Sequence, residues 1–202
     1  MTQLLEQKKP LILASTSIIR KQILEAVGLE FQAIAPLFDE EEGKLQNPNL
    51  TIAELAMFLA EQKALSVSAL NKNAVVIGSD QVCELDCKAI DKSKNAAEAE
   101  MQLNNFSGKI HYQNNATVVA KNGKIIFRKL SRVTLKMRKV SAEKIASYVN
   151  NDKPWGCAGS YKYEAMGKHL FEKISGDYYS VLGLNLQPLL NFLHRKKYIN
   201  IK

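Results

Sequence analysis

The chain has 202 residues, is 46% hydrophobic and contains only 10 glycines and 5 prolines, which is enough to bury one sizeable core or two small lobes around a cleft. The apolar run Leu11–Ala14 stops at Ser15, too soon for a signal peptide, and no stretch approaches the roughly 20 apolar residues that cross a bilayer. We therefore expect a cytoplasmic protein with no membrane partner.

Charge and metal-binding residue types narrow the partners further. Three cysteines without C-x-x-C spacing and three scattered histidines argue against a zinc site or a disulfide framework. The sequence still allows a cofactor cation that is held by oxygen ligands, such as magnesium or manganese, because carboxylates and substrate phosphates suffice to bind it. The net charge of +8 suits a polyanion, either a nucleotide or nucleic acid. Much of this charge is C-terminal, however, which is typical of a solvated helix end.

The first elements in chain order are a strand, a tight turn and a helix. Leu11–Ala14 is apolar throughout, and the polar residues Ser15–Ser17 follow it directly. The sequence IIRKQILEAVG then places apolar residues on one helical face, with Ser17 as a suitable N-cap and Gly28 as a suitable C-terminal stop.

Arg20 and Lys21 occupy the first turn of that helix, where the helix dipole disfavours cations. A bound phosphate would relieve this conflict, because the free N–H groups of the helix start and the hydroxyls of Ser15 and Ser17 would point toward it as well. The alternative, which we weight equally, is that both cations extend into water.

The next segments are a short strand, an acidic run and a long helix. Phe31–Ile34 is typical of a strand, and the acidic run Asp39–Glu42 is typical of a solvated loop, although one of its members could bind a metal ion. Thr51-x-x-Glu54 is a capping box that opens a helix through Leu70. Lys63 lies on this helix, where a lone lysine is most often a surface charge.

The segment Val75–Val82 is the most informative stretch. Its β-branched residues predict a short buried strand that ends at Gly78-Ser79 and carries Asp80 to its C-terminal end. Ligands of α/β proteins gather at such ends, and an acid there can serve as a general base or a metal ligand. The alternative, which the octapeptide alone favours, is a structural aspartate in a turn.

The remaining elements follow from alternation and turn signals. Cys83–Ile90 is typical of a hairpin, and the lysines of Asp91–Lys94 are either free or phosphate contacts. Trp155–Gly167 is typical of a loop that lines a pocket, in which Glu164 could hydrogen-bond to the edge of a nucleobase. The alternative is that this segment forms a corner of the sheet. The other predicted elements are helices at 96–106, about 141–150 and 187–195, and strands at 111–120, 124–140 and 171–174, two of them joined by Asn122-Gly123. Without repeats or a boundary, residues 1–202 are expected to form one domain.

The order of these motifs resembles the Maf-type nucleoside-triphosphate pyrophosphatases along nearly the whole chain. The blocks that carry the resemblance are LILASTSIIRKQIL from residue 11, FDE from 38, EQKA from 61, IGSDQV from 77, FSGKIH from 106, CAGSY from 157 and GDYYSVLGL from 176. Their order is far more specific than any single block. The variants GSDQVC and CAGSYKYE are similar to the branch that acts on 7-methyl-GTP rather than the dTTP/UTP branch.

This resemblance implies a fold, a reaction and a set of site residues. The fold would be α/β, with a mixed twisted sheet flanked by helices and two lobes around a central cleft, as in Maf and ITPase-like proteins. The reaction would be hydrolysis between the α- and β-phosphates, with a divalent cation. Asp80 would be the general base and, with Glu40, a metal ligand. Phosphate contacts would come from Ser15, Arg20, Lys21, Lys63 and Lys92, and substrate specificity from Ile19, Gln81 and Glu164.

Three positions depart from the family pattern. Ile19 replaces the aromatic residue of the 7-methyl-GTP branch, so a cation–π contact from that position is absent. Lys21 replaces an arginine and loses its two-pronged hydrogen bonding. Asp91-Lys92-Ser93 keeps the lysine of the usual G-K-P but not its neighbours.

The most specific hypothesis is a 7-methyl-GTP pyrophosphatase. The Glu164 carboxylate can accept from the ring N–H and amino group of guanine together, and it favours the positive charge of a methylated base. Two alternatives stay open: a dTTP/UTP pyrophosphatase of the same family, and a nucleotide-binding regulator that has lost catalysis. We expect no stable nucleic-acid partner, and a homodimer is compatible with the sequence.

Overall fold

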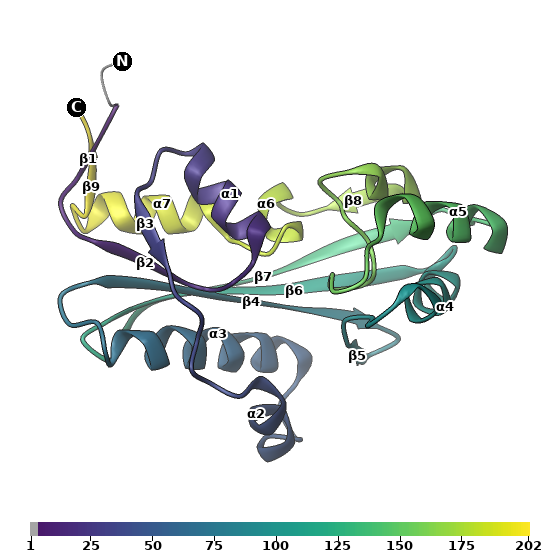
Figure 1. Cartoon of the computed structure of the whole chain (residues 1–202), viewed down its shortest axis with the longest axis horizontal. Helices are drawn as coiled ribbons and strands as arrows, with labels where there is room; N and C mark the ends of the chain where they lie inside the picture. The colour runs from purple at the N-terminus through teal and green to yellow at the C-terminus, as the bar shows by residue number, and fades with distance from the viewer. Residues whose placement is uncertain (1–3) are drawn as a thin grey trace.

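The computed structural model describes residues 4–202, which form a long mixed sheet with helices on both faces (Figure 1). Its elements are β1 (Leu5–Gln7), β2 (Leu11–Ala14), α1 (Ile18–Ala26), β3 (Phe31–Ala33), α2 (Glu40–Gln46), α3 (Ile52–Ser68), β4 (Val75–Leu85), β5 (Lys88–Ile90), α4 (Ala96–Phe106), β6 (Ile110–Lys121), β7 (Lys124–Met137), α5 (Ala142–Asp152), the 3₁₀ helix η1 (Met166–Leu170), β8 (Phe171–Ser175), α6 (Tyr178–Val181), α7 (Leu186–Arg195) and β9 (Ile199–Ile201).

The main sheet has the strand order β3-β2-β4-β6-β7-β8, with β5 paired to β4. β2 pairs in parallel with β3 and β4, whereas β6, β7 and β8 continue the sheet in antiparallel pairs. The expected mixed α/β sheet flanked by helices is thus confirmed. A second, two-stranded sheet joins β1 to β9 near the chain ends, and the sequence patterns did not predict it.

Separate hydrophobic clusters divide the molecule into two lobes along the same strands. In the first lobe, α1 and α7 pack on one face of β2 and β4, and α3 covers the other face. In the second lobe, α4, α5 and β8 surround a cluster that includes Phe106, Tyr161 and Phe171. Because β4, β6 and β7 are 11 to 14 residues long, they run through both lobes and hold them together.

The core of the second lobe contains a histidine. The ring of His111 stacks on Phe106 with centroids 4.6 Å apart, and its Nε2 lies 3.0 Å from the hydroxyl of Tyr161. Burial lowers the pKa of His111 to about 4, because the charged imidazolium would lose its hydration. This residue is therefore neutral at pH 7 and belongs to the packing of the lobe.

Local signals in the sequence set most of the element boundaries. Ser17 caps α1 by accepting from the N–H of Arg20, and Gly28 ends the helix region with a φ of +74°. Thr51 and Glu54 form the predicted capping box of α3. Asn122 and Gly123 both have positive φ between β6 and β7, as a two-residue hairpin turn requires.

Two features differ most from the sequence expectation, whereas the ends of the other predicted elements differ by at most three residues. The strand at Val75 does not end at Gly78-Ser79, because its pairing with β6 continues through Glu84 and carries β4 to Leu85. The acidic run at 39–42 is not a loop. Asp39 caps α2, and three glutamates fill the first turn of that helix, where their charge interacts favourably with the helix dipole.

No helix among residues 4–202 has the length and apolar character needed to cross a membrane.

Candidate active site

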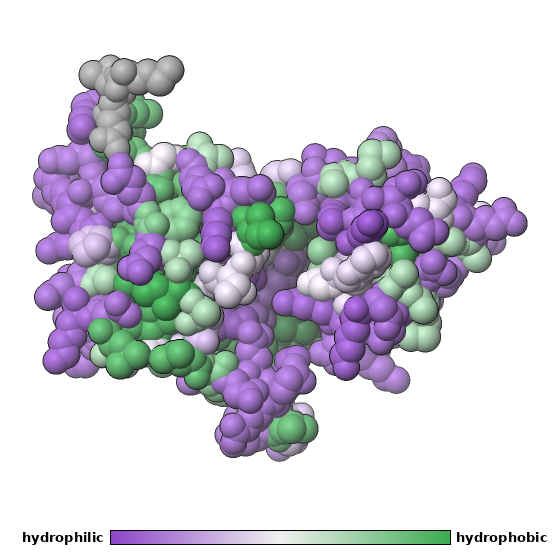
Figure 2. Space-filling view, viewed as in Figure 1, coloured by the Kyte–Doolittle hydropathy of each residue, from purple (hydrophilic) through white to green (hydrophobic). Residues whose placement is uncertain are grey.

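A cleft lies between the two lobes, where the surface is hollowed (Figure 2). It contains three adjoining cavities of about 770, 550 and 150 Å³, all lined in part by Lys92. The 550 Å³ cavity, which we call the nucleotide cavity, is within the size range of small-molecule sites. Residues from both lobes line it, including Ser15, Ile19, Arg20, Glu40, Lys63, Lys92, Trp155, Cys157, Lys162 and Glu164.

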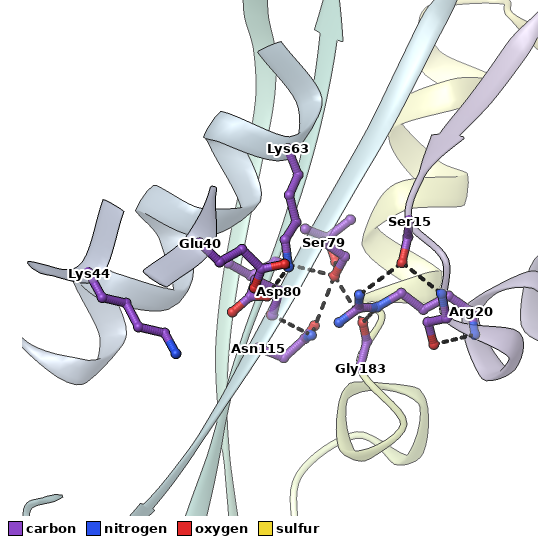
Figure 3. Close-up of polar contacts among 12 residues, drawn as sticks. Ser15, Arg20, Glu40, Lys44, Lys63, Ser79, Asp80, Asn115 and Gly183 are labelled. Carbon is purple, nitrogen blue, oxygen red and sulfur yellow. Dashed lines mark hydrogen bonds and ion pairs between the residues drawn. The ribbon is translucent and has the colours of Figure 1, made fainter. Parts of the chain in front are cut away.

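The centre of the cleft is an ionic cluster of Lys63, Asp80 and Glu40 (Figure 3). The Lys63 Nζ lies 2.5 Å from Oδ1 of Asp80 and 3.0 Å from Oε1 of Glu40. Lys63 is only 6% exposed, so the alternative of a surface charge does not apply. Asp80 and Glu40 together compensate its charge in the interior.

The backbone brings these three side chains together. β2 ends at Ala14, which pairs with Gly78, so that Asp80 lies two residues beyond the end of its parallel neighbour while β6 still pairs on the other side. Gly78 also allows α3 to approach β4 closely, since a Cβ there would lie 2.5 Å from the carbonyl oxygen of Ala60. One turn further along α3, Lys63 therefore reaches Asp80.

Asp80 is held firmly at its main chain and is open at one side-chain oxygen. Asn115 on β6 donates its Nδ2–H to the Asp80 carbonyl oxygen at 3.0 Å. The carboxylate uses Oδ1 for Lys63, and no hydrogen bond to Oδ2 is formed by any residue of the described part of the chain. The second oxygen is therefore free to accept a proton from a water molecule.

Arg20 forms the other side of the site. Its Nε donates to the carbonyl oxygen of Gly183 at 2.8 Å, and one terminal nitrogen donates to the Ser15 hydroxyl at 3.2 Å. Burial lowers the pKa of Arg20, although nearby Asp80 and Glu40 act in the opposite direction. Of the two alternatives for this cation, extension into water does not apply, because Arg20 is buried beside the cleft.

Lys21 and Lys92 differ in their placement. Lys21 is half-buried on α1 and is not among the described residues that line the three cavities. Lys92 is exposed and contributes to all three. Its neighbours fix the backbone around it: the N–H of Gly156 donates to the Ser93 carbonyl at 2.8 Å, and Ser160 donates its hydroxyl to that of Ser93 at 2.8 Å.

The three predicted specificity residues all line the cleft. Ile19 and Glu164 line both the nucleotide cavity and the smallest cavity, and Gln81 lines the smallest and the largest. Gln81 donates its amide to the Val181 carbonyl at 2.8 Å, and Glu164 is exposed. Burial, followed by the charge of Glu164, raises the pKa of the Cys157 thiol.

Sequence reasoning missed a buried polar network behind Asp80. Asn185 is 1% exposed and donates to Oδ1 of Asn115 at 2.7 Å, and Ser79 donates to the carbonyl oxygens of Ala116 and Gly183. The network links the strand of Asp80 to the segment that binds Arg20. Gly183 lies near the end of the GDYYSVLGL block and Asn185 directly follows it, but these residue types alone do not indicate this role.

The carboxylates of the site also bear on metal binding. No group of three histidine, cysteine, aspartate or glutamate residues suited to a metal ion lies among residues 4–202. Glu40 and Asp80 nevertheless converge on one ammonium group, so their oxygens can also converge on one cation.

Comparisons with known proteins give consistent matches over most of the chain. A profile of the family described as "Maf-like protein" matches residues 10–196. A "nucleoside triphosphate pyrophosphatase" of Legionella pneumophila subsp. pneumophila is 35% identical over 195 residues, covering 96% of this chain and 98% of that protein. A "7-methyl-GTP pyrophosphatase" of Brucella suis biovar 1 is 40% identical over 194 residues, covering 94% of this chain and 98% of that protein. Among solved structures, the chain is similar to a "nucleoside-triphosphatase / dITP/XTP pyrophosphatase" from Mycobacterium abscessus, with a TM-score of 0.41, 10% identity and coverage of 93% of this chain and 94% of that one.

Proposed function

This chain belongs to the Maf-like protein family, and we propose that it is a nucleoside-triphosphate pyrophosphatase that releases a monophosphate and pyrophosphate. The observation that carries the proposal is the convergence of Asp80, Lys63, Glu40 and Arg20 in one cleft, although these residues are far apart in the sequence. Relatives with this activity in their names are 35% to 40% identical over nearly the whole chain.

In the proposed mechanism, Asp80 accepts the proton of the attacking water through Oδ2 while Oδ1 stays bound to Lys63. The new bond forms between the water oxygen and the α-phosphorus, and the bond to the bridging oxygen breaks to release pyrophosphate. Lys63 has three N–H donors, of which one donates to Asp80, and its ammonium also forms an ion pair with Glu40. At least one donor therefore remains for a phosphate oxygen. Arg20 and Lys92 would neutralise further charge on the polyphosphate.

The two carboxylates fit a divalent cation such as magnesium or manganese. Oxygen donors are the ligands that these ions prefer, and two protein carboxylates suffice when substrate phosphates and water complete the coordination. Glu40 and Asp80 would hold the ion, which would supply positive charge to the phosphate oxygens.

The proposed base is 7-methylguanine. Glu164 lines the nucleotide cavity, and its carboxylate complements both the donors of guanine and the positive charge of the methylated ring. The 40% sequence identity to a protein named 7-methyl-GTP pyrophosphatase supports the same choice of base. A uracil edge, with an acceptor on each side of its N–H, would be repelled, which argues against the dTTP/UTP alternative.

The test is a comparison of 7-methyl-GTP, GTP, UTP and dTTP with magnesium or manganese, with pyrophosphate and phosphate measured separately. We expect pyrophosphate, with the highest kcat/KM for 7-methyl-GTP. Asp80→Asn should lower kcat at least 100-fold, because general-base catalysis contributes about 10² to 10⁴.

The matched control is Asp86→Asn. Asp86 lies in the turn after β4, is 65% exposed at its side chain and pairs with Lys109, and it has a positive φ that asparagine also adopts. This variant should retain wild-type activity. Full activity of Asp80→Asn would remove Asp80 as the base, release of phosphate alone would contradict the reaction, and nucleotide binding without turnover would favour the regulator.

A further inference from the structure

Trp155, the single tryptophan of the chain, has a side chain that the proposed mechanism does not use. It is 38% exposed and lines the nucleotide cavity together with Ile19, Lys162 and Glu164. Within residues 4–202, no aromatic or cation–π contact involves its indole ring. A large aromatic side chain without a ring partner at the wall of a cavity is available to a planar ligand.

The backbone fixes Trp155 in this position. Pro154–Cys157 forms a β-turn in which the Cys157 N–H donates to the Pro154 carbonyl at 3.2 Å. Gly156 has a φ of +83° at the third position, where a type II turn requires glycine. Trp155 is thus at the corner of the turn, and the bond from Gly156 N–H to the Ser93 carbonyl ties this corner to the Lys92 segment.

The first lobe contributes no aromatic side chain to the same cavity. Ile18 and Ile19 at the start of α1 line it from the first lobe, whereas Trp155 and Glu164 belong to the second. The exposed indole therefore provides, from the other lobe, an aromatic face that the first lobe lacks.

We infer that Trp155 is the base-stacking residue of this protein, selecting a cationic, N-methylated purine that lies between its indole ring and Ile19, with Glu164 at the edge of the base. The inference rests on the proposed function for the identity of the ligand as a nucleotide. Its physical basis is that indole is the best aromatic partner of a cation, and that the Glu164 carboxylate in the same cavity adds attraction for the same charge.

The chain permits a direct binding test, because its tryptophan fluorescence, excited selectively over that of its tyrosines, comes from one residue. Wild-type protein is titrated with 7-methyl-GMP and with GMP, which lack the bond that would be hydrolysed. We expect saturable quenching by 7-methyl-GMP and at least a roughly fivefold weaker affinity for GMP. Saturable binding of 7-methyl-GMP in calorimetry with unchanged fluorescence would overturn the inference, as would equal affinity for the two nucleotides.

Two variants separate stacking from simple packing. Trp155→Leu should lower the ratio of kcat/KM for 7-methyl-GTP over GTP by roughly five- to tenfold, mainly through KM, whereas Trp155→Phe should retain most of the ratio. The control is Tyr179→Leu, which removes an aromatic ring of nearly the same exposure, 37% against 38% for Trp155, outside the described cavity linings. It should leave the ratio unchanged.

The outcomes distinguish the two proposals. If none of the triphosphates is hydrolysed, the proposed function fails, and the fluorescence titration still decides the role of Trp155. If 7-methyl-GTP is hydrolysed to pyrophosphate but Trp155→Leu keeps the wild-type ratio, the function stands and the stacking role is wrong.

Discussion

At the scale of single residues, the charge of Lys63 is the feature on which the site depends. Its ammonium is buried beside Asp80, which is also buried, and it pairs with the partly exposed Glu40. The two buried charges are therefore compensated only while both are present. Breaking a buried ion pair by removing one partner usually costs about 3–5 kcal/mol, because the remaining charge is left without compensation.

We expect Lys63→Met to lower the free energy of unfolding by about 3 kcal/mol in urea denaturation at pH 7. Adding Asp80→Asn should restore part of this loss, because the uncompensated carboxylate is then gone. The control is Lys109→Met, which removes a pair between side chains that are 42% and 65% exposed and should cost less than about 1 kcal/mol. Equal costs for the two lysine variants would contradict the buried pair.

At the scale of elements, the contact between α3 and β4 places Asp80, the proposed general base, beside Lys63. Gly78 makes this contact possible, because an added Cβ would lie 2.5 Å from the Ala60 carbonyl oxygen and 2.8 Å from the Cβ of Ala64. Both neighbours belong to α3 and cannot move without moving the helix. The position of Lys63 thus depends on a glycine in another element.

Gly78→Ala should therefore displace α3 from the sheet, lower the free energy of unfolding by about 1–3 kcal/mol and reduce kcat by separating Lys63 from Asp80. Urea denaturation and steady-state kinetics measure the two effects. Gly123→Ala is the control, since no atom of the described chain lies within 4 Å of a Cβ added at this position. Its positive φ should cost about 1 kcal/mol without affecting kcat. Wild-type stability of Gly78→Ala would show that the helix adjusts freely.

At the scale of the whole molecule, the cleft and the net charge act together. Two lobes with separate cores share the long strands β4, β6 and β7, and the cations of the site come from both lobes. The protein as a whole carries a formal charge of +8, so a triphosphate approaches an attractive field before it makes any contact.

We expect kcat/KM to fall several-fold when ionic strength rises from about 0.01 M to about 1 M, because the Debye length falls from about 30 Å to about 3 Å. The value of kcat should change much less, since the bound substrate contacts the cations within the cleft. Sucrose in place of salt, at constant free metal concentration, is the control. Constant kcat/KM across this range would mean that long-range attraction plays no part in substrate capture.

The sequence by itself determined those features that depend on neighbouring residues. Ser17, the Thr51–Glu54 capping box and Asn122-Gly123 were correctly predicted to set boundaries, because caps and tight turns act within a few residues. The family and its reaction were also identified from the sequence, since many motifs in a fixed order are specific even where each is weak. The roles of the individual site residues stay predictions.

Only the tertiary structure decided the features that depend on distant segments. Pairing with β6 extends β4 to Leu85, and the approach of α3 to Gly78 buries Lys63. The same holds for the Asn115–Asn185 network and for the nucleotide cavity that Trp155 and Ile19 line from different lobes. The physical reason is that burial and charge compensation depend on atoms that come into contact only when the chain is folded. Local residue patterns therefore do not predict them.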